Sequence, residues 1–429
     1  MWRRDLWVLP ALIVAAAIAL GILLVLVDPG VTVLQKLSPR LFSVSPDGAR
    51  GVLTAIATAM LSVAGVVFSI TIATLSLTSQ QFTSRVLRTF VRDRGNQAVL
   101  GVFLGVFAYC LVVLRSVRSP EEGEGYVPQL ALLVAFGLAM LGVAFLIYFI
   151  SHIASSIQAS TIISRVAGDT ITVIRTDDPG EAAPDVLRVI TEEGEDQVTF
   201  TADGYVRGVA LASIASLAER RDWLVRVLVQ AGDFVTGGDA LARVVDKRGA
   251  PVEVSEEDAE ALRRCVWLAA SGDVEGDPGF GVRQLVDIAL KALSPGVNDV
   301  TTALTCIDYL SAVLLEARHQ QGHAVGRDSG GRVRVLVPKD DFADLLGEAM
   351  DQIRENGRTH MEVLLRQLQA LGRLVDAETD HVRLALLAGY AGAVEEAGAR
   401  GLSSAAARRK VAAGAEHLRE LAGVERRDA

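Results

Sequence analysis

The stretch that decides the fold runs from residue 52 to residue 77 and reads VLTAIATAMLSVAGVVFSITIATLSL. It contains no charged side chain and exceeds the roughly 20 apolar residues that an α-helix needs to cross a bilayer. Small and hydroxyl residues recur in it every three or four positions, on one face of a helix. They are Thr54, Thr58, Ser62, Gly65, Ser69, Ala73 and Ser76. The stretch therefore predicts a membrane-spanning helix with one uncharged, polar face.

Three further stretches have the same apolar character, and we expect each to be a transmembrane helix. They are residues 6–27, 98–114 and 130–150. The whole chain is 51% hydrophobic, which is too apolar for a single water-soluble globule. Basic residues near the predicted spans are in slight excess on the side of the N-terminus. We therefore expect a multi-pass protein of the plasma (inner) membrane, with the lipid bilayer as its partner and both termini in the cytoplasm.

The charge and the cysteines exclude several function classes. The formal net charge of −9 indicates no nucleic-acid partner, because such proteins carry a basic patch. Three cysteines cannot form a disulfide framework or a four-ligand zinc site. The chain lacks a phosphate-binding loop, a nucleophile elbow and the HExxH and CxxC metal motifs. We expect no enzyme activity, no cofactor and no metal.

One histidine pair is a candidate metal-binding set. His319 and His323 would share a helical face with Glu316 if the helix continued that far. Gly322 and the polar run HQQGH favour a fraying helix end instead.

We predict a mainly α-helical membrane protein whose four N-terminal spans are followed by a cytoplasmic α+β region. Apolar periodicity continues beyond the fourth span, so a helix is expected to carry the chain out of the membrane until Pro and Gly break it near residue 180. The predicted parts are a transmembrane domain (1–154), a helical extension and linker (155–196), a small β module (197–250), a helical region with an SPGVND turn and one later strand (251–337), and a C-terminal helical bundle (338–429).

Residues 197–250 have the pattern of a small β module. Short apolar runs end at Asp-Gly and Gly-Gly-Asp turns, which predicts four strands with a helical insert at residues 212–220. GYVRGV (204–209) and AGDFVTGGDALARV (231–244) resemble the half-barrel repeat of biotinyl- and lipoyl-type hammerhead folds. Carrier versions need a lysine at a hairpin tip, and Lys247 follows the last strand. We expect a structural module rather than a carrier.

The turn at residues 294–299 has two interpretations. A helix must end near it, and the next helix starts after Asn298 and Asp299. Asp299 can cap that helix, which is the ordinary structural role, or the turn can bind a ligand at the helix N-terminus. The candidate residues are Ser294, Pro295, Gly296, Asn298 and Asp299.

The polar face of residues 52–77 also has two interpretations. Small residues let transmembrane helices pack closely, and hydroxyl groups can line a pathway for a permeant species. The segment that follows has an apolar face and an Arg-rich face, as an amphipathic interfacial helix does. Its basic residues would favour anions at the mouth of such a pathway: Arg85, Arg88 and Arg92.

Two passages resemble a known family: SLTSQQFTSRVLRTF (76–90) and GFGVRQLVDIALKALSPGVNDVTTAL (279–304). With YFISHIASSIQ (148–158), they are similar to the bacterial predicted membrane protein family catalogued as domain of unknown function 2254. The chain departs from the family at Ser84 and at Val300, where proline is usual. The resemblance implies four N-terminal spans and a cytoplasmic domain, and it supplies no biochemical activity.

We expect an uncharacterised, homo-oligomeric membrane protein with a channel-like or transport pathway and a cytoplasmic regulatory domain. The alternative is a membrane-anchored sensing or protein-interaction module in which the spans only anchor and self-associate.

Overall fold

The computed structural model describes residues 7–27, 45–81, 94–118, 126–156, 158–176, 198–270 and 277–423. The chain forms two compact units, Met1–Thr161 and Ile162–Ala429. The division lies a few residues after the boundary expected at residue 154. Each unit has its own buried apolar core.

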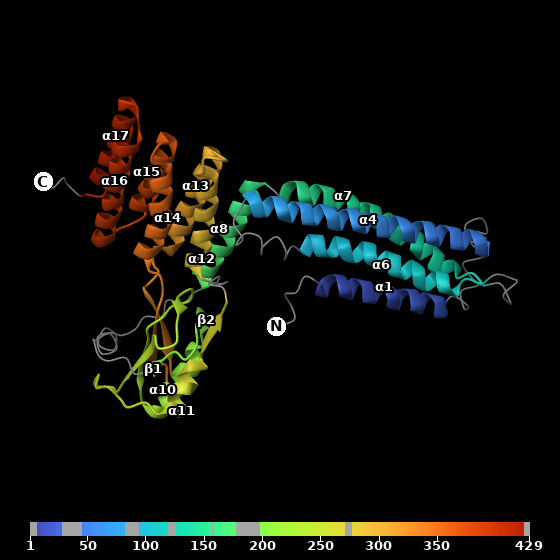
Figure 1. Cartoon of the computed structure of the whole chain (residues 1–429), viewed down its shortest axis with the longest axis horizontal. Helices are drawn as coiled ribbons and strands as arrows, with labels where there is room; N and C mark the ends of the chain where they lie inside the picture. The colour runs from blue at the N-terminus through green and yellow to red at the C-terminus, as the bar shows by residue number, and fades with distance from the viewer. Residues whose placement is uncertain are drawn as a thin grey trace. The chain divides into compact units, whose positions relative to one another are not determined.

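Unit 1 is a bundle of long apolar helices. They are α1 (Val8–Val27), α4 (Pro46–Gln81), α6 (Arg94–Ser116) and α7 (Gln129–Ser156). In Figure 1, α6 lies between α1 and α4, and it contacts all three other helices. Its inward residues are among the most buried of the unit, with Phe103 and Tyr109 at its centre. The hydroxyl of Tyr109 donates a hydrogen bond of 2.8 Å to the Ala131 carbonyl of α7.

Each of the four predicted spans is a helix in the structure, extending one to several residues past most of the predicted ends. By length and composition alone, however, five described helices are apolar enough to cross a membrane. The fifth is α13 (Val300–Ala317), which belongs to unit 2. Its Asp308 pairs with Arg366 and Arg373 of a neighbouring helix. The count of four spans is therefore not confirmed and stays a prediction.

The helical extension after the fourth span is α8 (Ala159–Thr176). It follows α7 after two residues, and its buried side is formed by Ile162, Ile163, Val166, Thr170 and Ile174. This spacing of three and four residues is the amphipathic pattern read from the sequence. The linker predicted up to residue 196 lies outside the described residues.

Two β-sheets, in which most strand pairs are antiparallel, form one lobe of unit 2. The strands are β1 (Val198–Thr199), β2 (Gly204–Val209), β3 (Leu224–Val227), β4 (Phe234–Val235), β5 (Ala240–Val245), β6 (Val266–Ala269), β7 (His323–Arg327) and β8 (Val333–Pro338). Their orders are β1-β5-β3-β8-β7 and β4-β2-β6. Helix α10 (Leu211–Arg221) is the predicted insert, and α11 (Glu256–Arg263) follows β5.

The expected hammerhead half barrel at residues 197–250 is not confirmed. The larger sheet takes in β8, which pairs in parallel with β3 through Val225 and Val335, and β7 beyond it. The smaller sheet takes in β6, in a region expected to be helical apart from one later strand. Alternating apolar residues identify a strand, but they do not identify its partner, and here the partners lie far along the chain.

The other lobe of unit 2 is an array of helices, seen side by side in Figure 1. They are α12 (Pro278–Leu293), α13 (Val300–Ala317), α14 (Phe342–Gly357), α15 (Met361–Asp376), α16 (His381–Gly401) and α17 (Ala405–Leu421). The four C-terminal helices lie within residues 338–429, where a helical bundle is predicted. Three of them begin after a residue whose side chain caps the helix: Asp341, Asp380 and Ser404.

Candidate functional site

The hydroxyl stripe of α4 lies on the outer face of unit 1. All of its members are exposed, and a Cβ built at Gly65 meets no atom within 4 Å. The buried residues of α4 lie on the opposite side of the helix: Leu53, Ala57, Met60, Ala64 and Val67. The stripe is therefore not a packing face within the described part of the chain.

Two of the stripe's hydroxyls bond to their own helix. Ser62 Oγ donates to the Thr58 carbonyl at 2.8 Å, and Ser69 Oγ donates to the Gly65 carbonyl at 2.9 Å. Such bonds use the hydroxyl proton and leave lone pairs on the oxygen that can accept another donor. Because these hydrogen bonds lie within α4, the two side chains keep them whether they face lipid, a second helix or a polar pathway.

Close packing of helices occurs on α6 instead. A Cβ at Gly101 would lie 2.8 Å from Ile13 Cδ1 and 3.0 Å from Pro10 Cα, and a Cβ at Gly105 would lie 3.3 Å from Ala17 Cβ. The two glycines form a Gly-x-x-x-Gly motif, the usual signal of closely approaching transmembrane helices. This motif is visible in the sequence, but it was not among the predicted features, which took small residues only from the stripe of α4.

The expected mouth of the pathway cannot be placed. Arg85, Arg88 and Arg92 lie outside the described residues, so their role stays a prediction.

The turn at residues 294–299 is exposed from Pro295 to Asp299, and its polar groups are engaged in ending one helix and starting the next. Asp299 caps α13 by accepting from the Thr302 backbone N–H at 3.1 Å and from its hydroxyl at 2.6 Å. These bonds lower the pKa of Asp299. Asn298 has the left-handed φ of 51°, and Ser294 Oγ donates to the Lys291 carbonyl. The geometry shows the capping role, and ligand binding there stays untested.

The GFG segment before this turn is a crowded junction. A Cβ at Gly281 would collide with Thr170 of α8, and a Cβ at Gly279 would collide with the Asp340 carboxylate. These glycines leave room for two neighbours of α12, a role that only contacts distant in sequence can show.

The electrostatics of this junction are unusual. Asp277 caps α12 and accepts from the Phe280 N–H at 3.1 Å. Burial, and next the carboxylate of Asp340, raise the pKa of Asp277 to about 6. Burial likewise raises the pKa of Asp340. Both carboxyl groups therefore keep a proton to a higher pH than an isolated aspartate does.

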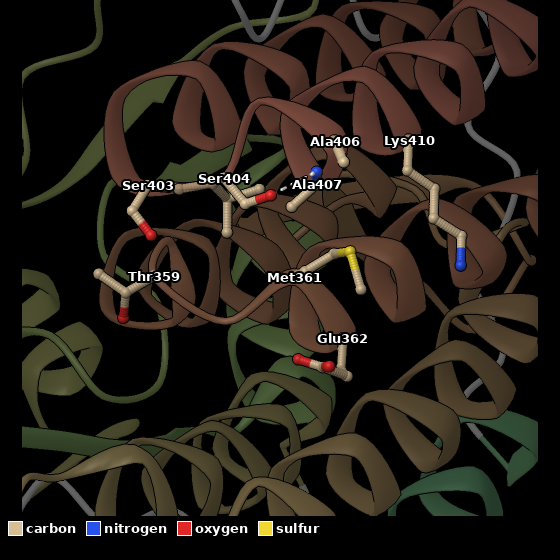
Figure 2. A pocket seen from close by; sticks show the side chains of 9 residues that line it. Thr359, Met361, Glu362, Ser403, Ser404, Ala406, Ala407 and Lys410 are labelled. Carbon is tan, nitrogen blue, oxygen red and sulfur yellow. Dashed lines mark hydrogen bonds between the residues drawn. The ribbon is translucent and has the colours of Figure 1, made fainter.

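A hollow of about 530 Å³ opens where α15 and α17 begin. Figure 2 shows Glu362 and Lys410 on its walls and the Ser404 hydroxyl bonded to the Ala407 N–H, a capping bond of 3.4 Å. Most of the lining side chains are exposed, so the hollow is shallow and open.

The histidine pair does not share a helical face. Helix α13 ends at Ala317, and His323 lies on β7. Glu316 pairs with Arg175 of α8 at 2.6 Å. In the part of the chain that the structure describes, no three His, Cys, Asp or Glu side chains are grouped as metal ligands.

Comparisons with known proteins give a family but no activity. Uncharacterized proteins of Mycobacterium bovis and of two strains of Mycobacterium tuberculosis are 33% identical to this chain over 386 residues, which cover 89% of this chain and 74% of theirs. No solved structure matches the chain at a significant level. The family described as Predicted membrane protein (DUF2254) matches residues 3–373. The chain therefore belongs to this family of membrane proteins of unknown function.

Proposed function

We propose that this protein self-associates in the membrane through α4 and that the hydroxyl stripes of neighbouring copies line an uncharged polar pathway. The cytoplasmic region would then regulate that pathway. The observation that carries the proposal is the orientation of α4: its hydroxyl stripe faces away from the bundle of its own chain.

The shape of the stripe supports contact between copies. Small side chains leave a shallow groove along the helix, and helices in membranes associate where small residues allow close approach. Gly65 is at the middle of the stripe, with open space around it. The inner face of α4 is already occupied by its own bundle, through residues such as Leu53 and Ala64. Within the described residues of α4, the side that carries the stripe is exposed and available to a second copy.

The chemistry of the stripe supports a pathway. The hydroxyl groups of Ser62 and Ser69 donate hydrogen bonds to backbone carbonyls. Their oxygens can therefore still accept hydrogen bonds from water or interact with a permeant cation. The arginines that follow α4 in the sequence would instead favour anions at one end. Flux measurements therefore decide whether the pathway prefers cations or anions.

The alternative function is an anchored sensing or interaction module. One observation favours it: the same backbone bonds leave Ser62 and Ser69 satisfied, so a contact between helices needs no water or ion beside them. In this case self-association would occur without transport.

Replacement of Ser62 and Ser69 by Leu separates the two functions. We expect the S62L/S69L variant to lose self-association, measured by light scattering of the protein in detergent and by cross-linking in vesicles. Loss of potassium or chloride flux from liposomes at the same time supports the pathway. Wild-type oligomers that carry neither ion support the anchored module. Ile70→Leu, on a flank of the same helix, is the matched control.

Oligomers that survive in the S62L/S69L variant, with unchanged flux, contradict both the interface and the pathway. A wild-type protein that is monomeric in vesicles contradicts the proposal directly.

A further inference from the structure

Two carboxylates from distant parts of the chain meet at the first turn of α12. Asp277 caps this helix, and Asp340 lies in the connection between β8 and α14. Asp340 Oδ2 occupies the space that a Cβ of Gly279 would need, and Asp277 Oδ2 lies 3.2 Å from the same position. Only glycine leaves room for both carboxylates at this helix end.

Asp340 also joins this turn to the sheets. Its Oδ1 accepts a hydrogen bond of 3.0 Å from Gln230 Nε2, and Gln230 lies between β3 and β4. The backbone N–H of Gln230 donates to Asp233 Oδ2 at 2.9 Å, which fixes the turn that carries it. The carboxylate pair therefore lies where the sheet lobe meets the helical lobe of unit 2.

Other charged groups face the pair from the surrounding elements. They are Lys339, Arg283, Asp344 and Asp233. Arg283 of α12 forms an ion pair with Glu348 of α14, and Asp344 completes the capping box of Asp341. Burial is the largest cause of the raised pKa of both carboxyl groups, and Asp340 is the next cause for Asp277. Asp273 and Glu275 precede Asp277 and lie outside the described residues.

We propose that Asp277 and Asp340 form a proton-sensitive joint between the sheet lobe and α12. With one proton between them, the two side chains can sit together over Gly279 and hold the first turn of α12 against the connection after β8. With both ionised, their repulsion weakens this contact. The raised pKa of Asp277, about 6, places the change between mildly acidic and neutral pH.

The same turn of α12 contacts the helix that follows the membrane spans. Gly281, two residues beyond Gly279, lies against Thr170, and a Cβ there would be 2.8 Å from Thr170 Cγ2. Thr170 is buried and belongs to α8, which follows α7 in the chain. A displacement of the first turn of α12 would therefore be felt by α8. This inference concerns unit 2 and does not depend on whether α4 lines a pathway.

Hydrogen exchange of the full-length protein in detergent, at pH 5.0 and pH 7.5, tests the joint. After correction for the intrinsic effect of pH, we expect the amides of residues 280–284 to exchange about tenfold faster at pH 7.5, since each pKa unit corresponds to a tenfold change in equilibrium. In Asp340→Asn, which leaves the cap of α12 intact, the difference between the two corrected rates should become smaller, because the repulsion by Asp340 is removed while the burial of Asp277 remains. Asp277→Asn should have the same effect.

Asp376→Asn is the matched control, because Asp376 is an exposed aspartate at the end of α15. It should keep the wild-type difference between the two pH values. Equal corrected rates in the wild type overturn the proposal, and so does a full pH difference that persists in Asp340→Asn. If Asp277→Asn does not fold, Asp340→Asn decides alone.

Discussion

Two helices of unit 1 carry small residues at helical spacing, and they use them in opposite ways. On α6, Gly101 and Gly105 are buried against α1. On α4, Gly65 and its hydroxyl neighbours are exposed. The spacing is alike, so spacing alone does not determine which face of a helix is packed.

The difference lies in what surrounds each face. The glycines of α6 lie on a helix with neighbours on several sides, while the stripe of α4 lies opposite the residues that fill the core, such as Met60 and Val67. A small residue permits close approach, but a partner has to be present for the approach to occur. We call a glycine filled when an added Cβ would contact a neighbouring helix, and open when it would meet no atom within 4 Å. Filled and open glycines should therefore respond differently to substitution.

The largest effect is expected at the filled glycine of α6. In Gly101→Leu, the added side chain collides with Pro10 and Ile13 and displaces α1, which should cost about 3 kcal/mol or more. Gly137→Leu on α7 is the control, because a Cβ there meets no atom within 4 Å. Thermal unfolding in detergent compares the two variants. Equal losses in both would remove the distinction between filled and open glycines.

The second effect concerns the carboxylates over Gly279. The pKa of Asp277 is raised from 3.8 to about 6 in the folded protein, so its stabilising contribution is complete below its unfolded pKa and is lost as the pH rises through about 6. Asn can still cap α12 and cannot ionise. Asp277→Asn should therefore be more stable than the wild type by about 2 kcal/mol at pH 7.5.

As the pH falls from 7.5 toward 3.8, the advantage of Asp277→Asn should shrink, and it should nearly disappear below pH 3.8, where the wild-type carboxyl is protonated in both the folded and the unfolded protein. Melting temperatures across this pH range check the sign. An advantage that grows as the pH falls would contradict the assignment of the proton to this pair.

The third effect compares two glycines near α8. Gly281→Ala should cost about 1–2 kcal/mol, because the new methyl group collides with Thr170. Gly168→Ala, on α8 itself with open space around it, should stabilise by about 0.5–1 kcal/mol through helix propensity. In the pair Gly281→Ala with Thr170→Ala, part of the loss should return. Unfolding in urea measures all three, and a stable Gly281→Ala would show that α8 moves away without cost.

The smallest effect on folding is expected on the stripe. Gly65→Ala adds a methyl group to open space and should change the free energy of unfolding by less than about 0.5 kcal/mol. If α4 forms the contact between copies, the same substitution should still reduce the fraction of oligomer seen by cross-linking. An unchanged oligomer fraction would place the contact on another surface.

The elements that local patterns define were predicted well. Uninterrupted apolar runs predicted α1, α4, α6 and α7, and a helical bundle was predicted where the C-terminal helices lie. These signals are local because a helix satisfies its backbone within one segment. The sheets were predicted less well, since β3 finds its parallel partner β8 more than a hundred residues later. The residues of the candidate site on α4 were predicted, but the sequence did not show that they face away from the bundle.

The sequence by itself determined that the chain has long apolar helices, an α+β region and the motifs of its family. Only the tertiary structure decided which faces are covered. The stripe of α4 is open, Gly101 is filled by α1, and the carboxylates of Asp277 and Asp340 share the space over Gly279. The physical reason is that spacing along a helix fixes which side chains share a face, whereas the neighbour of that face is set by contacts between segments far apart in the chain.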